Sequence, residues 1–318
     1  MLPRVSVRVA AVQAAPVFLD RDATVEKAVG LIEEAGRSGA SLIGFPEGFI
    51  PGHPGWVELL PFDDHAVELG KRLFQNAVEV PGPAVDKIAA ACDEHSMTAV
   101  VGICERVAGS TGTMFNAQLF VDERGQLAAK HQKFVPTVGE RLVHAPGRTG
   151  TENSCRIPEG TVSGLICGEN SNHLAQYSTS VSYPSVHVAA WPPHFSPQID
   201  MPEAIEVVSR ALAYSLKCFV INAVAVISDD MLESYGTTAE HRAFLNAAES
   251  GGVASIVAPT GRIIARGEPG KEELIYADVD LDEILGPKMV HDVAGHYNRP
   301  ELFAHLFKSP NPADQPPA

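Results

Sequence analysis

A single cysteine at the end of an apolar run is the residue of this sequence best placed to do chemistry. Cys167 follows the run from Thr161 to Ile166, which predicts a buried strand, and it precedes Gly168 and a polar segment typical of a helix start. A thiol between a strand and a helix N-terminus lies where backbone N–H groups and the helix dipole favour an anion. Cys167 is therefore a candidate nucleophile.

Two further residues at predicted strand ends could complete a catalytic set. Glu47 follows the short apolar run from Ser41 to Phe45, and Lys133 lies near the end of a strand predicted over residues 128–134. A carboxylate can take the thiol proton and later activate water, and an ammonium can stabilise developing negative charge. Spacing alone does not bring the three residues together. From spacing alone, the simpler interpretation is that Cys167 is a core thiol, Glu47 a loop carboxylate and Lys133 a surface lysine.

The elements around these residues predict an α/β protein, because apolar strands alternate with segments of helical periodicity. Strands are predicted over residues 8–13, 41–45, 98–104, 115–121, 128–134, 161–166, 186–191, 218–226, 252–257, 263–266 and 275–279. Helices are predicted over residues 20–36, 64–78, 84–94, 172–182, 201–216 and 281–285, and residues 136–150 form a long loop. Two hairpins among the alternating elements suggest two layers of sheet with helices outside. We expect residues 1–307 to form one domain and the proline-rich residues 308–318 to form a flexible tail.

Composition argues against several classes of function. The formal net charge of −15 disfavours nucleic acid and anionic membrane surfaces as partners. No apolar run is long enough to cross a membrane, and no leader peptide is evident, so we expect a cytoplasmic protein. The five cysteines include no CxxC pair, and the 12 histidines show no metal-ligand spacing. No glycine-rich phosphate loop is present either, so the sequence predicts neither a metal nor a cofactor.

Three segments resemble, in order, the three signature motifs of the nitrilase superfamily of carbon–nitrogen hydrolases. The segment from Phe45 to Pro54 resembles the glutamate motif. The segment from Lys133 to Arg141 resembles the lysine motif of the nitrilase branch, with its second glutamate, and Gly164 to Asn170 resembles the cysteine motif. Gly295 to Pro300 resembles a segment found late in nitrilases proper, and the whole resemblance extends from Val7 to Phe303.

This resemblance implies a fold, an assembly and a set of roles. The implied fold is a four-layer α-β-β-α sandwich, and the implied assembly is a homodimer packed helix to helix or a larger homo-oligomer. Cys167 would be the nucleophile, Glu47 the general base, and Lys133 the group that stabilises tetrahedral intermediates. Glu140 would be an auxiliary carboxylate that orients Lys133 and the substrate, and the amide N–H of Gly168 would share the oxyanion role.

The sequence departs from the family pattern at positions that would shape the pocket. Gly168 follows the cysteine where the family commonly has tryptophan, which would open space beside the nucleophile. His53 and His144 stand where nitrilases often carry tyrosine and tryptophan. We expect His53, Gly168, Glu169 and Trp191 to bind substrate. The alternatives are that His53 is a hydrogen-bonded loop residue, that Glu169 complements a helix dipole, and that Trp191 packs in the core.

The predicted activity is hydrolysis of a nitrile to a carboxylic acid and ammonia. The Cys167 thiolate would add to the nitrile carbon to give a thioimidate, and water activated by Glu47 would convert it through a thioester to the acid. An amidase of the same superfamily, acting on small carboxamides, is the alternative that Gly168 keeps open. A catalytically silent oligomeric scaffold is the alternative from another class, and the intact set of Glu47, Lys133 and Cys167 argues against it.

Overall fold

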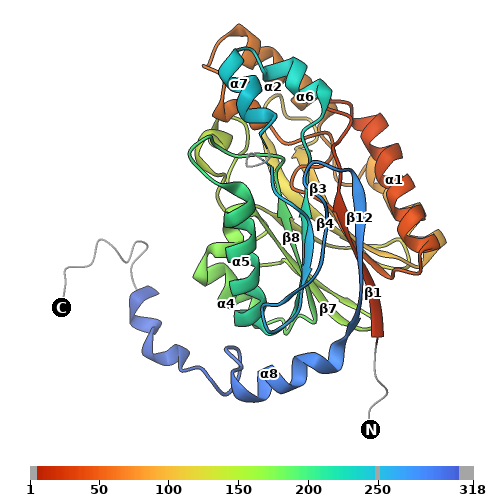
Figure 1. Cartoon of the computed structure of the whole chain (residues 1–318), viewed down its shortest axis with the longest axis vertical. Helices are drawn as coiled ribbons and strands as arrows, with labels where there is room; N and C mark the ends of the chain where they lie inside the picture. Colours follow the sequence, from red (N-terminus) through yellow and green to blue (C-terminus); the bar gives the residue numbers. More distant parts are fainter. Residues whose placement is uncertain (1–5, 248–250, 308–318) are drawn as a thin grey trace.

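The computed structural model describes residues 6–247 and 251–307, whose strands form one continuous, curved sheet (Figure 1). The strands are β1 (Ser6–Gln13), β2 (Leu42–Gly44), β3 (Thr98–Arg106), β4 (Met114–Val121), β5 (Leu127–Gln132), β6 (Ser154–Ile157), β7 (Gly160–Ile166), β8 (Val186–Trp191), β9 (Phe219–Val224), β10 (Ser255–Val257), β11 (Ile263–Arg266) and β12 (Glu273–Asp280). Their order is β5-β4-β3-β2-β1-β9-β8-β7-β6, with β12 paired to β1 and β10 paired to both β9 and β11.

The helices and short 3₁₀ turns lie between and after these strands. The helices are α1 (Arg21–Arg37), α2 (Asp64–Asn76), α3 (Pro83–His95), α4 (His173–Ser180), α5 (Met201–Leu216), α6 (Asp229–Tyr235), α7 (Ala239–Leu245) and α8 (Leu285–Val290). The 3₁₀ turns are η1 (Gly55–Glu58), η2 (Val138–Leu142), η3 (Cys167–Ser171), η4 (Leu281–Ile284), η5 (Pro300–Leu302) and η6 (Ala304–Phe307). Among the helices of the described residues, none combines the length and the apolar character needed to span a bilayer.

The sheet has two halves that pack against each other. One half holds β1 to β5 with β12, the other holds β6 to β9 with β10 and β11, and β1 pairs with β9 where they join. Val100 and Phe120 of the first half share one apolar core with Val188 and Ile221 of the second. At Gly44 of β2 the halves approach so closely that a Cβ would lie 2.7 Å from Cγ1 of Val188. Glycine at this position therefore permits the close packing of the two halves.

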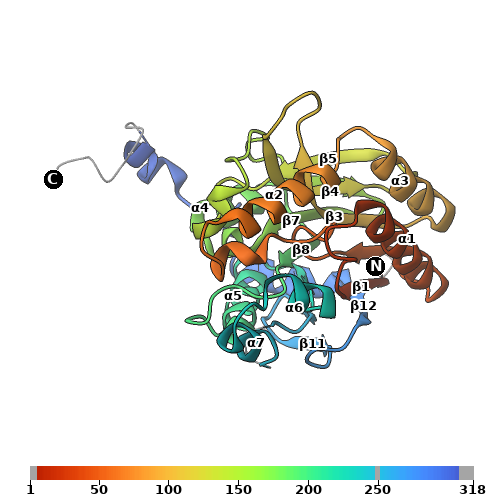
Figure 2. The ribbon, with the colours of Figure 1, turned by 90° about the horizontal axis from the view of Figure 1, so that it is seen from above.

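Helices cover both outer faces of the sheet (Figure 2). The buried residues of α1 recur at helical spacing, so that one face of the helix is apolar. Ile32 of α1 and Ile88 of α3 join Val101 in a cluster on the outer side of the first half. Ile205 and Leu212 of α5 pack on the second half. The resulting order of helix, sheet, sheet and helix confirms the predicted four-layer sandwich.

The strand directions bring three segment ends to one edge of the sheet. β2, β1, β9, β8 and β7 are parallel to one another, and β3 is parallel to β2. β5 runs in the same direction as β3, because each is antiparallel to β4. Glu47, Lys133 and Cys167 follow β2, β5 and β7, so all three lie beyond carboxyl ends at the same edge.

The structure differs from the predicted elements in a few places. β5 ends at Gln132, so Lys133 follows the strand, and the predicted loop over residues 136–150 contains the turn η2. The helix predicted over residues 172–182 is α4, which begins at His173 and is capped by the side chain of Asn172, whereas Cys167–Ser171, outside the predicted elements, form the 3₁₀ turn η3. β6, α6 and α7 have no counterpart among the predicted elements.

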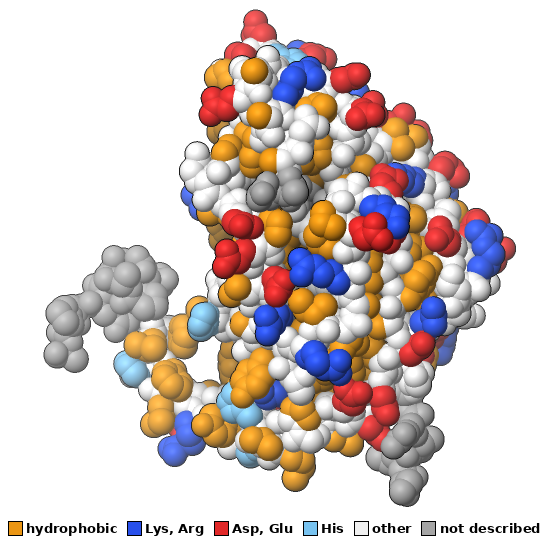
Figure 3. Space-filling model, in the orientation of Figure 1, with side chains coloured by type: hydrophobic (Ala, Val, Ile, Leu, Met, Phe, Trp, Pro, Cys, Tyr) orange, Lys and Arg blue, Asp and Glu red, His pale blue; other side chains and the backbone are white. Residues whose placement is uncertain are grey.

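The segment after β12 leads away from the sandwich (Figure 1). It carries exposed apolar side chains, visible as an orange band in Figure 3, and these include Met289, Val290, Phe303 and Phe307. The segment is linked to α4 by Asn298, whose Nδ2 donates a hydrogen bond of 2.8 Å to the hydroxyl of Tyr177. The tail predicted over residues 308–318 lies outside the described residues.

Candidate active site

Cys167 occupies a sharp turn directly after β7, as the first residue of η3. Its φ is +50°, in the left-handed region that side-chain-bearing residues seldom adopt. Two neighbours along the chain hold the turn. Glu169 accepts a hydrogen bond of 2.9 Å from the backbone N–H of Ile166, and Asn170 donates one of 2.9 Å to the carbonyl of Cys167. The backbone on both sides of the thiol is therefore fixed by side chains.

A buried polar chain supports Asn170. Its Oδ1 lies 3.0 Å from Nε2 of His187, and Nδ1 of His187 lies 2.8 Å from Oγ of Ser163. All three side chains are fully buried. Burial lowers the pKa of His187 to about 3, so its imidazole is neutral at physiological pH. His187 therefore positions the residue that anchors Cys167 without adding charge beneath the thiol.

We expect the free energy of unfolding to fall less on acidification in His187→Gln than in the unmodified protein. The unfolded chain binds a proton at this histidine near pH 6.5, whereas the folded chain does so only near pH 3, so folding stability falls as the pH drops through this window. The contribution at pH 5 is about 2 kcal/mol, since each pKa unit corresponds to about 1.4 kcal/mol.

The measurement is the free energy of unfolding in urea near pH 7 and near pH 5. His187→Gln should show a smaller difference between the two pH values than the unmodified protein. The exposed His296, replaced in the same way, is the control and should leave that difference unchanged. Equal differences in His187→Gln and the unmodified protein would contradict the assignment of a buried, neutral His187.

Glu47, Lys133 and Glu140 meet in one buried hydrogen-bond network. Nζ of Lys133 donates to Oε1 of Glu47 at 2.7 Å and to Oε2 of Glu140 at 2.6 Å. Nδ2 of Asn116 donates to Oε1 of each glutamate, at 2.7 Å in both cases. The side chains of Glu47, Lys133 and Glu140 are at most 3% exposed. A lysine and an amide thus bridge two carboxylates that come from different loops.

The two carboxylates differ in how many of their oxygens are engaged. Oε2 of Glu140 also accepts a hydrogen bond of 2.9 Å from the N–H of Thr137, and its Oε1 lies 3.0 Å from Nδ1 of His144. Oε2 of Glu47 is buried and has no hydrogen-bond partner. Glu47 therefore has an oxygen available to accept a proton, whereas Glu140 is fully used in holding its neighbours.

Burial and mutual charge shift the pKa values of this cluster in different directions. Burial raises the pKa of Glu47, although Lys133 opposes the shift. Burial disfavours the charged form of Lys133, but Glu47 and Glu140 outweigh it and raise the pKa of the ammonium. Burial also disfavours ionised Glu140, yet Lys133 holds the pKa of that carboxyl well below its usual range.

The pKa of the Cys167 thiol is shifted by burial and by the same charged cluster. Burial and the charge of Glu47 raise the pKa of Cys167, while Lys133 and the backbone N–H of Gly168 act in the opposite direction. The resting thiol is therefore protonated, and any nucleophilic step at Cys167 requires a base. The unpartnered oxygen of Glu47 is the group in this network that can accept the proton.

One small cavity joins the cluster to the thiol. It is lined by Glu47, His53, Glu58, Lys133, Thr137, Glu140, Cys167, Pro192 and Phe195. Its volume is about 10 Å³, close to the space that a single water molecule requires. The four residues predicted to be catalytic therefore line one small cavity.

Of the four predicted substrate-binding residues, His53 and Gly168 lie at this site. His53 lines the cavity, and its Nδ1 is 3.8 Å from Oε1 of Glu47 and has no hydrogen-bond partner. Burial lowers the pKa of His53 to about 3. Gly168 is exposed beside the thiol, and a Cβ there would have only Oγ1 of Thr137 within 4 Å, at 3.9 Å. The glycine thus leaves open space next to Cys167, as the sequence predicts.

Glu169 and Trp191 do not line the cavity, and the structure places both side chains in the scaffold. Oε1 of Glu169 accepts a hydrogen bond of 2.6 Å from the N–H of Phe134, so this carboxylate ties the cysteine turn to the segment after Lys133. The indole N–H of Trp191 donates to Oδ1 of Asn222 at 3.1 Å, and the ring packs in the core. Both side chains stabilise neighbouring parts of the fold, and neither lines the cavity at Cys167.

Sequence reasoning missed Asn116, Glu58, Thr137 and Phe195. A signal was present for Asn116, because Asn116 and Gln118 are polar residues at alternate positions of a strand that is otherwise apolar. Such residues share one face, and a polar side chain on a buried face needs a partner. The other three residues stand in turns and loops, where the sequence pattern carries no comparable signal.

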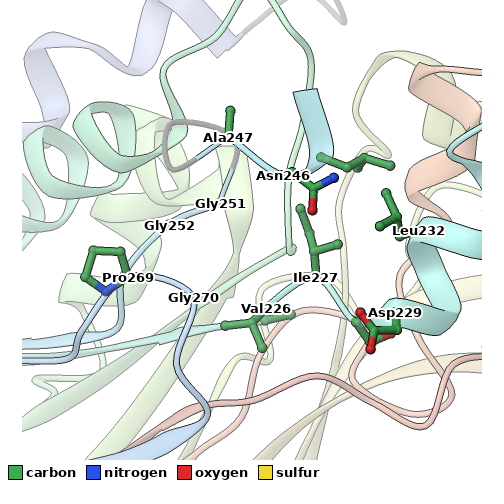
Figure 4. A pocket seen from close by; sticks show the side chains of 13 residues that line it. Val226, Ile227, Asp229, Leu232, Asn246, Ala247, Gly251, Gly252, Pro269 and Gly270 are labelled. Carbon is green, nitrogen blue, oxygen red and sulfur yellow. The ribbon is translucent and has the colours of Figure 1, made fainter. Parts of the chain in front are cut away.

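A larger cavity lies elsewhere in the molecule (Figure 4). Its volume is about 300 Å³, and it is bounded by the end of β9, the start of α6 and the end of α7, where Val226, Asp229 and Asn246 line it. Its lining residues include no cysteine, lysine or histidine and none of the residues around Cys167. Within residues 6–247 and 251–307, no group of three or more His, Cys, Asp or Glu side chains is arranged to hold a metal ion.

Comparison with known proteins agrees with the motifs. Residues 8–285 match the family model of carbon-nitrogen hydrolases. An arylacetonitrilase from Aspergillus kawachii is 34% identical over 305 residues, which cover 93% of this chain and 90% of that protein. An aliphatic nitrilase from Rhodococcus rhodochrous is 34% identical over 307 residues, covering 94% of this chain and 82% of that protein.

Solved structures of low sequence identity share the fold. The structure of a carbon-nitrogen hydrolase from Helicobacter pylori aligns with a TM-score of 0.72 at 15% identity, covering 96% of this chain and 99% of that one. An amidase from Nesterenkonia sp. aligns with a TM-score of 0.65 at 14% identity, covering 95% of this chain and 96% of that one. These likenesses establish the four-layer sandwich and carry no information on substrate.

Proposed function

Because this chain belongs to the carbon-nitrogen hydrolase family and is a hydrolase of carbon–nitrogen bonds, we propose that it converts a nitrile to a carboxylic acid and ammonia. The observation that carries the proposal is the unpartnered Oε2 of Glu47 in the same cavity as the protonated thiol of Cys167. Similarity to an arylacetonitrilase and an aliphatic nitrilase over more than nine-tenths of the chain supports nitriles as the substrate class.

In the first step Glu47 accepts the proton of the Cys167 thiol, and the sulfur forms a bond to the nitrile carbon. The proton passes from Glu47 to the nitrile nitrogen, which gives a thioimidate. Lys133 lies within hydrogen-bonding distance of Glu47, so its charge is already in place at the reacting centre. The N–H of Gly168 points toward the sulfur and can share in stabilising negative charge.

In the second step a water molecule, deprotonated by Glu47, adds to the thioimidate carbon. The nitrogen takes the proton that Glu47 removed from the water, which gives a tetrahedral intermediate with a hydroxyl and an amino group. The hydroxyl proton then passes to the nitrogen through Glu47 as the carbon–nitrogen bond breaks, so that ammonia leaves and a thioester remains on Cys167. A second water hydrolyses the thioester in the same way and returns the thiol. Glu140 acts through Lys133 and Asn116, because both of its oxygens are engaged with neighbouring groups and none is left for the substrate.

Hydrolysis of small carboxamides is the alternative function. Addition of the Cys167 thiol to an amide would give the tetrahedral adduct of this scheme directly. Loss of ammonia from that adduct would leave the same thioester on Cys167. The open position at Gly168 keeps this alternative in view, because a planar carboxamide carries both an oxygen and a nitrogen on the attacked carbon and is broader there than a linear nitrile. A silent scaffold is disfavoured by the complete buried network around Lys133.

The experiment that separates these functions follows ammonia release from a panel of aliphatic and aromatic nitriles alongside the matching carboxamides. Turnover of nitriles to acids supports the proposal. Turnover of amides alone would replace it with the amidase, and the absence of ammonia from both panels would leave only the scaffold.

Assembly and location are also proposals. The exposed apolar side chains of the segment after β12, such as Met289 and Phe303, support a homodimer or larger homo-oligomer. Light scattering of the full chain tests this, and a monomer would contradict it. All five cysteines are free, which supports a cytoplasmic location. Detection of the protein in an exported fraction of cells would contradict that location.

A further inference from the structure

The cavity at Cys167 has a solvent side made of three residues. Six of its nine lining residues are buried, whereas Glu58, Thr137 and Phe195 are partly exposed. We call these three residues the rim. A substituent attached to the carbon that Cys167 attacks must leave the buried part of the cavity past the rim. The rim is therefore the part of the site that meets the portion of a substrate that does not react.

Glu58 gives the rim a negative charge with a free oxygen. Its Oε1 accepts a hydrogen bond of 3.0 Å from the N–H of Gly139, which fixes the position of the carboxylate. No lysine, arginine or histidine among the described residues forms an ion pair with Glu58. Burial raises the pKa of Glu58, and a cation bound beside it would offset that shift. The second oxygen is thus available to an incoming group.

The other groups of the cavity favour a cation over an anion at this place. Phe195 and Thr137 line the cavity, and their side chains are of the types that contact a cation, an aromatic ring through its π face and a hydroxyl through a lone pair. Lys133 is the one lysine or arginine that lines the cavity, and it is engaged with Glu47 and Glu140. A carboxylate on the substrate would therefore find no partner at the rim and would be repelled by Glu58.

We propose that the rim selects substrates that carry a cationic amino group, which binds the carboxylate of Glu58 beside Phe195 and Thr137. The proposal rests on the proposed function for the reacting nitrile or amide, and it adds the chemical class of the substituent. It makes Glu58 a specificity-determining residue that takes no part in the bond-breaking steps.

The test compares three matched nitriles: an ω-aminoalkanenitrile, the alkanenitrile with a methyl group in place of the ammonium, and an ω-cyanoalkanoate of similar length. The chain lengths are varied together, and the three matching amides are run in parallel. We expect kcat/KM to be highest for the amino compound, by about tenfold over the methyl compound, as for one partly buried ion pair. In Glu58→Gln the ratio of kcat/KM for the amino compound to kcat/KM for the methyl compound should fall to about one, mainly through a higher KM for the amino compound.

Glutamine is the matched replacement, because its amide oxygen can still accept the hydrogen bond from Gly139. Glu94→Gln, at an exposed site on α3, makes the same change in net charge and is expected to keep the advantage of the amino compound. Equal kcat/KM values for the amino and methyl compounds in the unmodified protein would overturn the proposal. So would an advantage that survives in Glu58→Gln.

A binding experiment separates this proposal from the proposed function. Calorimetry with Cys167→Ala measures the affinity for the amino and methyl nitriles without turnover. Tighter binding of the amino compound that disappears in the double variant Cys167→Ala, Glu58→Gln supports the rim, even if the unmodified protein were to hydrolyse neither nitriles nor amides. Equal affinities would overturn the rim and leave the hydrolase assignment intact.

Discussion

Replacement of Cys167 by alanine is expected to abolish ammonia release from every nitrile and amide that the protein hydrolyses. The covalent route needs a sulfur at this position, and the other residues that line the cavity offer no thiol to take its place. The measurement is kcat in the ammonia assay, together with mass spectrometry of the protein mixed with substrate. The unmodified protein should gain the mass of an acyl group, and Cys167→Ala should not.

Cys155→Ala is the matched control. Cys155 and Cys167 are both 8% exposed and both free, but Cys155 lies on β6 and does not line the cavity. We expect Cys155→Ala to keep its turnover and its acyl adduct. Activity retained by Cys167→Ala would remove the cysteine from the mechanism and with it the proposed thioimidate.

Replacement of Lys133 by alanine is expected to lower kcat by at least about 10²- to 10³-fold, the effect of losing one group that stabilises an oxyanion. It should also lower the free energy of unfolding by about 3–5 kcal/mol, because Glu47 and Glu140 would remain buried without the cation that both contact. Rates are therefore measured below the unfolding transition of the variant, with circular dichroism to establish that it is folded.

Lys130→Ala provides the comparison. Lys130 lies on β5, the strand that leads to Lys133, and pairs with Glu105, but it does not line the cavity. This change should leave kcat within a small factor of normal. Lys133→Arg keeps the charge and should recover folding more fully than turnover, since the guanidinium cannot reproduce the short contacts to both carboxylates. A folded Lys133→Ala with near-normal kcat would contradict the role assigned to the lysine.

Much of the fold and the central residues of the site are predictable from the sequence. Apolar runs such as those before Glu47 and Cys167 are buried on both sides of parallel strands, and this leaves a continuous hydrophobic signal. The family resemblance then connects residues that lie far apart along the chain. Cys167, Glu47, Lys133 and Glu140 were placed together in this way, and the structure brings them to one cavity.

The remaining features depend on tertiary contacts that leave little local signal. β6 is short, with exposed Arg156 between buried Cys155 and Ile157, so its pattern is too brief to stand out. The role of Asn116 arises from contacts with residues on two other segments. The sequence predicts substrate binding for Glu169, because the position of this residue after the cysteine does not reveal that its carboxylate accepts a hydrogen bond from the N–H of Phe134.

The division of the sheet into two halves has a consequence for the order of events during folding. Glu47, Lys133 and Glu140 belong to the half built from β1 to β5, whereas Cys167 follows β7 in the other half. Neither half alone holds both the thiol and its base. Recovery of activity on refolding therefore reports the docking of the halves, and we expect it to lag behind the return of helical circular dichroism.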